Sequence, residues 1–173
     1  MSRFGGSATA NTAVFFAEYT DVQIPGSVIV LGPPVTFQGT VTNAGAAEFK
    51  GIEFEGTALF TENLSGMMSI GYIDAEYTEF FVGGVNVASA RAVQNTPDLT
   101  GNASLTYATP VSLGSMAGTL SFTGTASYRG DTQQFEVAIP LLDQSAYWLY
   151  DASINWLSED DHWRFGIHGR NLS

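Results

Sequence analysis

The sequence predicts an all-β fold, an antiparallel up-and-down segment of a transmembrane β-barrel, and three observations lead to it. Apolar and polar residues alternate with period two through most of the chain, as in strands that have one apolar face. Short and long connections follow one another in strict alternation between these strands. Charged residues make up only 13% of the chain, about half the share that is usual in a soluble domain.

The first three strands are expected at residues 8–23, 40–61 and 67–80. One face of the second strand consists of Ile52, Phe54, Ala58 and Phe60. Its opposite face carries Glu53, Glu55 and Thr57. The third strand places Met68, Ile70 and Tyr72 at one parity. These rows predict one apolar and one polar face for this part of the sheet.

The other four strands are expected at residues 99–109, 118–129, 146–157 and 162–172. The clearest alternation has Leu120, Phe122, Gly124, Ala126 and Tyr128 on one face. Opposite them lie Thr119, Ser121, Thr123, Thr125, Ser127 and Arg129. The fourth, sixth and seventh strands show the same pattern, with apolar rows that include Leu105 and Tyr107, Ile154 and Trp156, and Phe165 and Ile167.

Three charged residues interrupt these apolar rows. Lys50 shares the parity of Ile52, and Asp74 and Glu76 share that of Tyr72. All three lie toward the long connections. Either the strands project beyond the bilayer at that end, or a β-bulge shifts the parity.

The connections differ in length according to their place in the chain. The short ones are at residues 62–66, 110–117 and 158–161, and the long ones at 24–39, 81–98 and 130–145. In an up-and-down sheet this order puts every short turn at one rim and every long loop at the other. Outer-membrane barrels have this layout, with short periplasmic turns and long extracellular loops.

Aromatic residues gather near both rims. Trp156, Trp163 and Tyr107 lie near short turns, and Tyr128 and Trp148 lie near a long loop. This distribution is typical of the two aromatic girdles that border the apolar band of a membrane barrel. The alternative is that they are core aromatics of a soluble β-domain.

Composition excludes several classes of function. The chain has 173 residues, a formal net charge of -11 and only 6 Lys and Arg residues, so it has no basic surface for nucleic acid. It has no cysteine, which excludes thiol catalysis and zinc ribbons. Its 45% hydrophobic content argues against disorder.

The candidate reactive groups do not form a catalytic or metal site. Glu53 and Glu55 could act as an acid and base pair, but a solvated pair on the lumen side explains them better. The run Glu159 to His162 lacks the spacing of a calcium loop, and a polar turn is the better interpretation. His162 and His168 lie too far apart along a strand to share a metal ion. We predict no enzyme activity, no metal site and no cofactor.

Seven blocks of the chain carry a further signal, at residues 13–24, 41–60, 64–80, 95–107, 118–132, 141–156 and 163–173. The most specific are the NAG and KGIEFEG segments within the second block and GRNL in the last. Together, and in this order, the blocks resemble the C-terminal barrel portion of TonB-dependent outer-membrane receptors. The whole chain, residues 1–173, is therefore expected to form one partial barrel domain.

The resemblance implies a barrel of about 22 strands in the bacterial outer membrane, surrounded by outer-membrane lipid and filled by an N-terminal plug domain. It also implies energy supply from an inner-membrane TonB complex through the plug, and a small-molecule substrate. The sequence shows about seven strands, no plug, no TonB box and no final aromatic strand. We therefore expect a fragment of a longer receptor, whose remaining strands complete the barrel.

The function expected from the resemblance is active uptake of a scarce nutrient, namely an iron–siderophore complex, cobalamin or a glycan. Candidate substrate-binding residues at the outer rim are Arg91, Arg129, Asp131 and Glu136, although each could be an ordinary solvated loop charge. Two alternatives from other classes stay open. One is a passive, porin-like small barrel, and the other is a soluble β-sandwich carbohydrate-binding module.

Overall fold

The computed structural model describes residues 7–34 and 36–172, which form a seven-stranded sheet and a small two-stranded hairpin. Residues 1–6, 35 and 173 of the predicted domain lie outside the described residues. The strands of the large sheet are β1 Ala8–Val30, β2 Thr36–Leu59, β3 Leu64–Glu79, β6 Leu99–Pro110, β7 Gly118–Arg129, β8 Tyr147–Ser158 and β9 Arg164–Gly169. The connection between β3 and β6 contains the hairpin, β4 Phe81–Val82 and β5 Val85–Asn86, and one 3-10 turn, η1 Ala88–Ala90.

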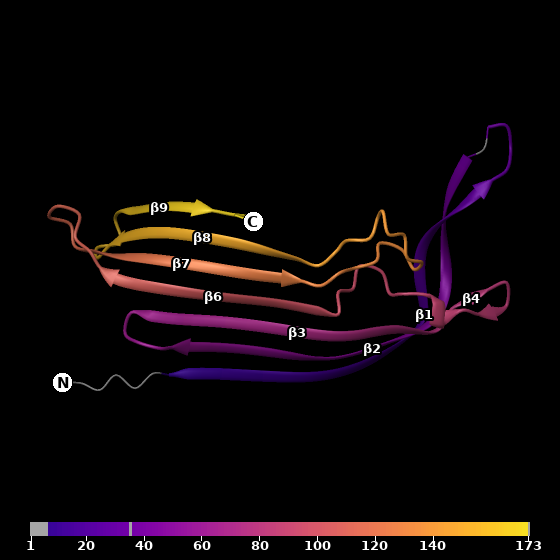
Figure 1. The fold of residues 1–173 in the computed structure, drawn as a ribbon, viewed down its shortest axis with the longest axis horizontal. Helices are drawn as coiled ribbons and strands as arrows, with labels where there is room; N and C mark the ends of the chain where they lie inside the picture. The colour runs from indigo at the N-terminus through magenta and orange to yellow at the C-terminus, as the bar shows by residue number, and fades with distance from the viewer. Residues whose placement is uncertain (1–6, 35, 173) are drawn as a thin grey trace.

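Each strand of the large sheet pairs antiparallel with the next one along the chain (Figure 1). The predicted all-β, up-and-down topology is confirmed. The three turns predicted to be short lie at one end of the sheet, and the other three connections lie at the opposite end (Figure 1), as the order of connections predicts. Within the described part of the chain, no helix has the length and apolar character needed to cross a membrane.

The first long connection is much shorter than predicted. Residues 24–39 were expected to form a loop, but β1 continues to Val30 and β2 begins at Thr36. The ladder runs without a break from Gln23 and Asn43 to Val30 and Thr36. Pro25 and the glycines of this segment indicate a loop by local rules. β1, however, is an edge strand of the described sheet, and an edge strand tolerates a proline that lacks a backbone donor.

Strand register places every predicted apolar row on the same face of the sheet. Residues opposite each other in an antiparallel ladder point to the same side. Phe122 on β7 is opposite both Tyr107 on β6 and Ile154 on β8, and Ile154 is opposite Ile167 on β9. We call this side the apolar face, and the side of Thr123 the polar face. The predicted alternation is therefore confirmed across strands as well as along them.

Most of the apolar face is uncovered in the described chain; Trp156, at the short-turn end, is buried there at 3% exposed. On the same face, Val14 is 78% exposed and Ile167 is 75% exposed. Apart from the hairpin of two-residue strands, the described residues form a single sheet layer. A β-sandwich needs a second sheet packed on that face, so this arrangement favours a surface that meets lipid.

The charged residues in the apolar rows lie at the long-connection ends of β2 and β3. The ladder between β2 and β3 is regular from Lys50 and Asp74 down to Leu59 and Ser65, so no bulge separates the charges from the apolar row. Lys50 Nζ lies 3.3 Å from Asp74 Oδ2 and 3.2 Å from Glu76 Oε1. On β2 and β3 the outward surface therefore changes from apolar to charged at this height, which supports strands that project past the bilayer.

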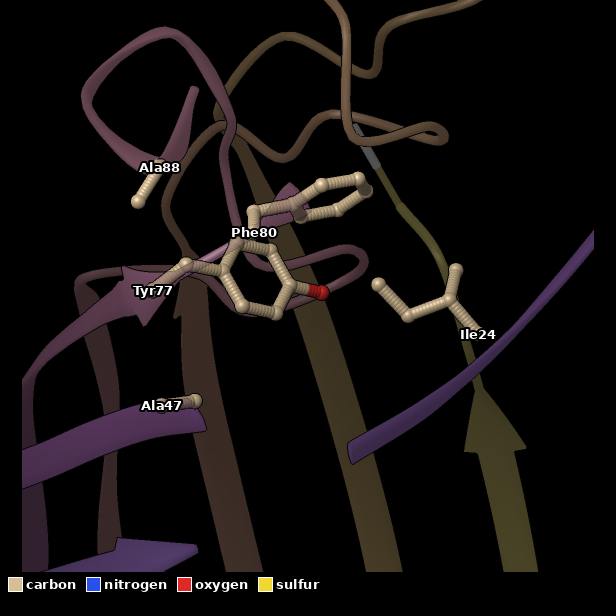
Figure 2. Packing of buried hydrophobic residues seen from close by; sticks show 5 residues of the cluster. All are labelled: Ile24, Ala47, Tyr77, Phe80 and Ala88. Carbon is tan, nitrogen blue, oxygen red and sulfur yellow. The ribbon is translucent and has the colours of Figure 1, made fainter. Parts of the chain in front are cut away.

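The buried core lies among the long connections, at the outer end of the sheet. Figure 2 shows Ile24, Ala47, Tyr77, Phe80 and Ala88 packed together. The rings of Tyr77 and Phe80 meet edge to face, with centroids 5.2 Å apart. Burial, together with the nearby charge of Glu136, raises the pKa of Tyr77. The connection after β3 is thus a packed unit.

Replacing one residue of this core should unfold the connection between β3 and β6 locally and leave the strands of the sheet intact. Phe80 is 4% exposed, so Phe80→Ala should cost this unit about 3–5 kcal/mol. Limited proteolysis of the folded protein should then show faster cleavage within residues 81–98. Phe81→Ala is the matched control, because Phe81 is 47% exposed. Equal cleavage of the two variants would contradict a packed connection.

Candidate functional site

Four residues from four strands form one row across the polar face. Register pairs Glu53 on β2 with Gly71 on β3, Gly71 with Thr100 on β6, and Thr100 with Arg129 on β7. The row lines a pocket of about 320 Å³. Its other lining residues are Phe15, Tyr72, Ile73, Asn95, Thr96 and Pro97. Residues that are far apart in the chain thus meet below the outer connections.

Two glycines, Gly71 and Gly51, leave space for the pocket because they have no side chain. Gly71 puts no side chain between Glu53 and Thr100, and a Cβ there would lie 3.3 Å from Thr100 Oγ1. Gly51 leaves room for the ring of Phe15, since a Cβ at Gly51 would lie 2.6 Å from Phe15 Cζ. The ring therefore packs against the sheet backbone, and the pocket keeps an aromatic wall.

Arg129 connects the wall of the sheet to the outer connections. Its Nη2 donates a hydrogen bond of 3.2 Å to the carbonyl oxygen of Asn95. Asn95 has a φ of 54°, a left-handed conformation that asparagine tolerates better than most residues. Its amide donates to the carbonyl oxygen of Gln133 at 2.9 Å. A guanidinium has five donors, so Arg129 has others for a bound molecule.

The two charged groups of the pocket do not neutralise each other. Among the described residues, the salt bridges involve Lys50 with Asp74 and Glu76, and His162 with Asp160. Glu53 and Arg129 are in none of them. The pocket consequently has a negative end and a positive end, with Gly71 and Thr100 between them.

Of the four predicted rim residues, Arg129 alone lines this pocket. Arg91 packs on the loop core, where its guanidinium carbon lies 5.4 Å from the centre of the Phe80 ring. Glu136 joins the two long connections, because its carboxylate accepts a hydrogen bond of 3.2 Å from Gln94 Nε2. Asp131 is exposed at the start of the last long connection. The structure thus brings Arg129 to the pocket and places Arg91 and Glu136 in loop packing.

The pocket residues Phe15, Gly71 and Thr100 were not among the predicted site residues. Phe15 did offer a signal, because it is an aromatic residue at the parity of the polar face. Glu53 was expected to be a solvated residue on the lumen side of the strand. It lies on the polar face of the sheet. Glu55 is two positions away on the same face and does not line this pocket.

A smaller hollow lies further along the polar face. It has a volume of about 130 Å³ and lies over β7, β8 and β9. Its lining includes Thr123, Thr125, Asp151, Ser153, His168 and Arg170. Asp151 Oδ1 accepts a hydrogen bond of 2.9 Å from the Asn171 amide, so this carboxylate also holds the chain after β9. Both pockets of the polar face are therefore lined by acidic, basic and hydroxyl side chains.

The acidic turn between β8 and β9 satisfies its own polar groups. The Ser158 hydroxyl donates to Asp160 Oδ1 at 2.5 Å, and this bond together with the His162 amide lowers the pKa of Asp160. His162 Nδ1 lies 3.1 Å from Asp160 Oδ2. In the described chain, no group of three or more His, Asp or Glu side chains is arranged to hold a metal ion.

Comparison with known proteins identifies the family. The family model for TonB dependent receptor-like β-barrels matches residues 3–172, nearly the entire chain. No curated protein and no solved structure matches significantly. The family consists of outer-membrane receptors and transporters and is not a family of enzymes. The single sheet with opposed apolar and polar faces agrees with the match, and the chain belongs to the TonB-dependent receptor β-barrel family.

Proposed function

We propose that this chain forms part of the wall of an outer-membrane receptor for active nutrient uptake, and that its polar face contacts the substrate. The observation that carries this proposal is the row from Glu53 to Arg129, which lies on the polar face directly below the long connections. In a barrel that face borders the lumen, through which a substrate passes. The candidate substrates are an iron–siderophore complex, cobalamin and a glycan.

The partners in this proposal follow from the family. A plug domain and further strands of the same receptor complete the lumen, and the inner-membrane TonB complex moves the plug. Family membership favours this active mechanism over a passive porin. The largely uncovered apolar face disfavours a soluble carbohydrate-binding sandwich, which would bury that face between its sheets.

Charge reversal at Arg129 tests the site. Arg129→Glu should reach the outer membrane normally, because the side chain lies on the polar face, but uptake should weaken. One charge-assisted hydrogen bond contributes about 1.5–3 kcal/mol, so half-maximal uptake should need roughly 10- to 150-fold more substrate. Uptake of the three substrate classes would be measured in cells with and without a functional TonB complex.

Asp131→Lys is the matched control for this experiment. It also changes the charge by two units, but at an exposed position outside the pocket. Its uptake should equal that of the wild type. If Arg129→Glu transports every substrate as well as the control at equal surface abundance, the pocket is not part of the substrate path.

A further inference from the structure

Opposite charges stand at the two ends of one cross-strand row without pairing. Neighbouring strands lie about 4.7–4.9 Å apart, so the three steps from Glu53 to Arg129 separate their Cα atoms by about 14 Å. The middle of the row has no charge, because Gly71 has no side chain and Thr100 has a hydroxyl group. Phe15 adds an apolar wall to the same pocket.

This order of groups selects against ligands of a single charge. A purely anionic ligand is repelled by Glu53 and by the net charge of -11 on the chain. A purely cationic ligand meets Arg129. A ligand is favoured by both ends only when it has a cationic group near Glu53 and an anionic group near Arg129.

We propose that this pocket binds a short peptide through its free termini, with the amino group at Glu53 and the carboxylate at Arg129. The proposal rests on the proposed uptake function and adds short peptides to the three substrate classes considered for its site. An extended chain spans about 3.3–3.6 Å per residue, so a peptide of three or four residues spans roughly 10–14 Å. Arg129 suits the carboxylate because a guanidinium can donate two parallel hydrogen bonds to it.

The backbone and side chains of the peptide also find partners in the pocket. The Thr100 hydroxyl can donate to or accept from a peptide group. Phe15 and Ile73 provide apolar contact for a side chain. The open position at Gly71 gives the peptide access to the sheet surface, and Gly71→Val should fill that position. Gly101→Val is its control, because Gly101 is the next residue on β6 after Thr100 and faces the apolar side.

Isothermal titration of the complete receptor in detergent tests the proposal with tetraalanine as ligand. Tetraalanine with both termini free should bind roughly tenfold or more tightly than its N-acetylated or C-amidated forms, the scale of one charge-assisted hydrogen bond. A series from dialanine to hexaalanine should show strongest binding at three or four residues. Absence of binding, or equal affinity of the free and capped peptides, would overturn the proposal.

Two variants assign each terminus to its residue. Glu53→Gln should abolish the preference for the free amino group and keep the preference for the free carboxylate. Arg129→Gln should do the reverse. Because Arg129 also holds Asn95, Arg129→Lys serves as a second variant that keeps the positive charge and should keep the carboxylate preference. Glu55→Gln is the control and should bind like the wild type, since Glu55 does not line the pocket. If the preferences persist in Glu53→Gln and Arg129→Gln, the termini are bound elsewhere.

Parallel uptake measurements separate this proposal from the one on which it rests. If uptake of another substrate depends on TonB and on Arg129 but the peptide termini have no effect on binding, the receptor function stands and the peptide is overturned. If peptides bind as described but no uptake depends on TonB, the binding site stands and the receptor function is overturned.

Discussion

Phe122→Lys should strongly reduce the amount of receptor in the outer membrane, whereas Thr123→Lys should leave it nearly unchanged. The two residues are neighbours on β7 and point to opposite faces. Phe122 lies between Tyr107 and Ile154 on the apolar face. A lysine near the middle of the bilayer costs about 2–4 kcal/mol on the lipid side of a barrel strand.

Thr123 has a polar environment that accepts the same change. Its Oγ1 lies 3.0 Å from Oγ1 of Thr106, so Thr123→Lys replaces one side of a polar pair. The lysine ammonium can stay hydrated in the lumen. Surface abundance would be measured by labelling intact cells, with total expression as the reference. Equal loss of both variants would mean that the two faces of β7 are wrongly assigned.

The sequence predicts the strands and their faces well because both depend on local alternation. A period of two fixes which residues of a strand share a side, and seven strands with one apolar side can pack in a single layer only when those sides agree. The ladders confirm this for Ile52 opposite Tyr72 and for Tyr72 opposite Leu99. The uninterrupted ladder at Lys50 also excludes the β-bulge, which was one of the two explanations that the sequence left open.

Local pattern fails at the first hairpin and at the loop core. Pro25 lies in a segment that reads as a loop, yet its backbone continues the ladder opposite Val41. Tyr77 and Phe80 become core residues because η1 and the end of β3 close around them, and Ile24 joins them from another hairpin. Such contacts depend on how the connections fold back onto the sheet. No periodic pattern in the sequence indicates this fold-back.

The pocket could be predicted only in part, because it depends on register between strands. Arg129 was identified from its place at the end of a strand. Its relation to Glu53 is set by two intervening strands, and Gly71 contributes by having no side chain. Alignment between strands is determined by the whole sheet, so the sequence of any one strand does not reveal the row.

Trp156→Ala should be the most destabilising aromatic substitution at the short-turn end of the sheet. Trp156 is 3% exposed, and its Nε1 donates a hydrogen bond of 2.7 Å to the carbonyl oxygen of Val111. Its ring stacks on Phe165 at a centroid distance of 5.9 Å. The side chain therefore fixes the turn between β6 and β7 to β8. Removing a buried ring of this size costs about 3–5 kcal/mol.

Gly118 provides the space that this tryptophan needs. A Cβ at Gly118 would lie 2.5 Å from both Trp156 Cε2 and the Leu157 carbonyl oxygen, so Gly118→Val should force the ring out of its place. Trp156→Phe should lose less than Trp156→Ala. It keeps an aromatic ring but leaves the Val111 carbonyl without its donor, at about 1–3 kcal/mol. Comparing Trp156→Phe with Trp156→Ala thus separates the contribution of the hydrogen bond to stability from that of the ring.

Trp163→Ala is the matched control, because Trp163 flanks the next turn and stacks on the same Phe165 at 6.2 Å. Trp163 is 54% exposed, as expected for a girdle residue at the membrane interface, so its loss should cost much less. Denaturant midpoints of the purified receptor in detergent would rank the four variants. Trp156→Ala and Gly118→Val should show the largest decreases and Trp163→Ala the smallest. Equal midpoints for the two alanine variants would place Trp156 in the girdle with Trp163 and contradict its role in fixing the turn.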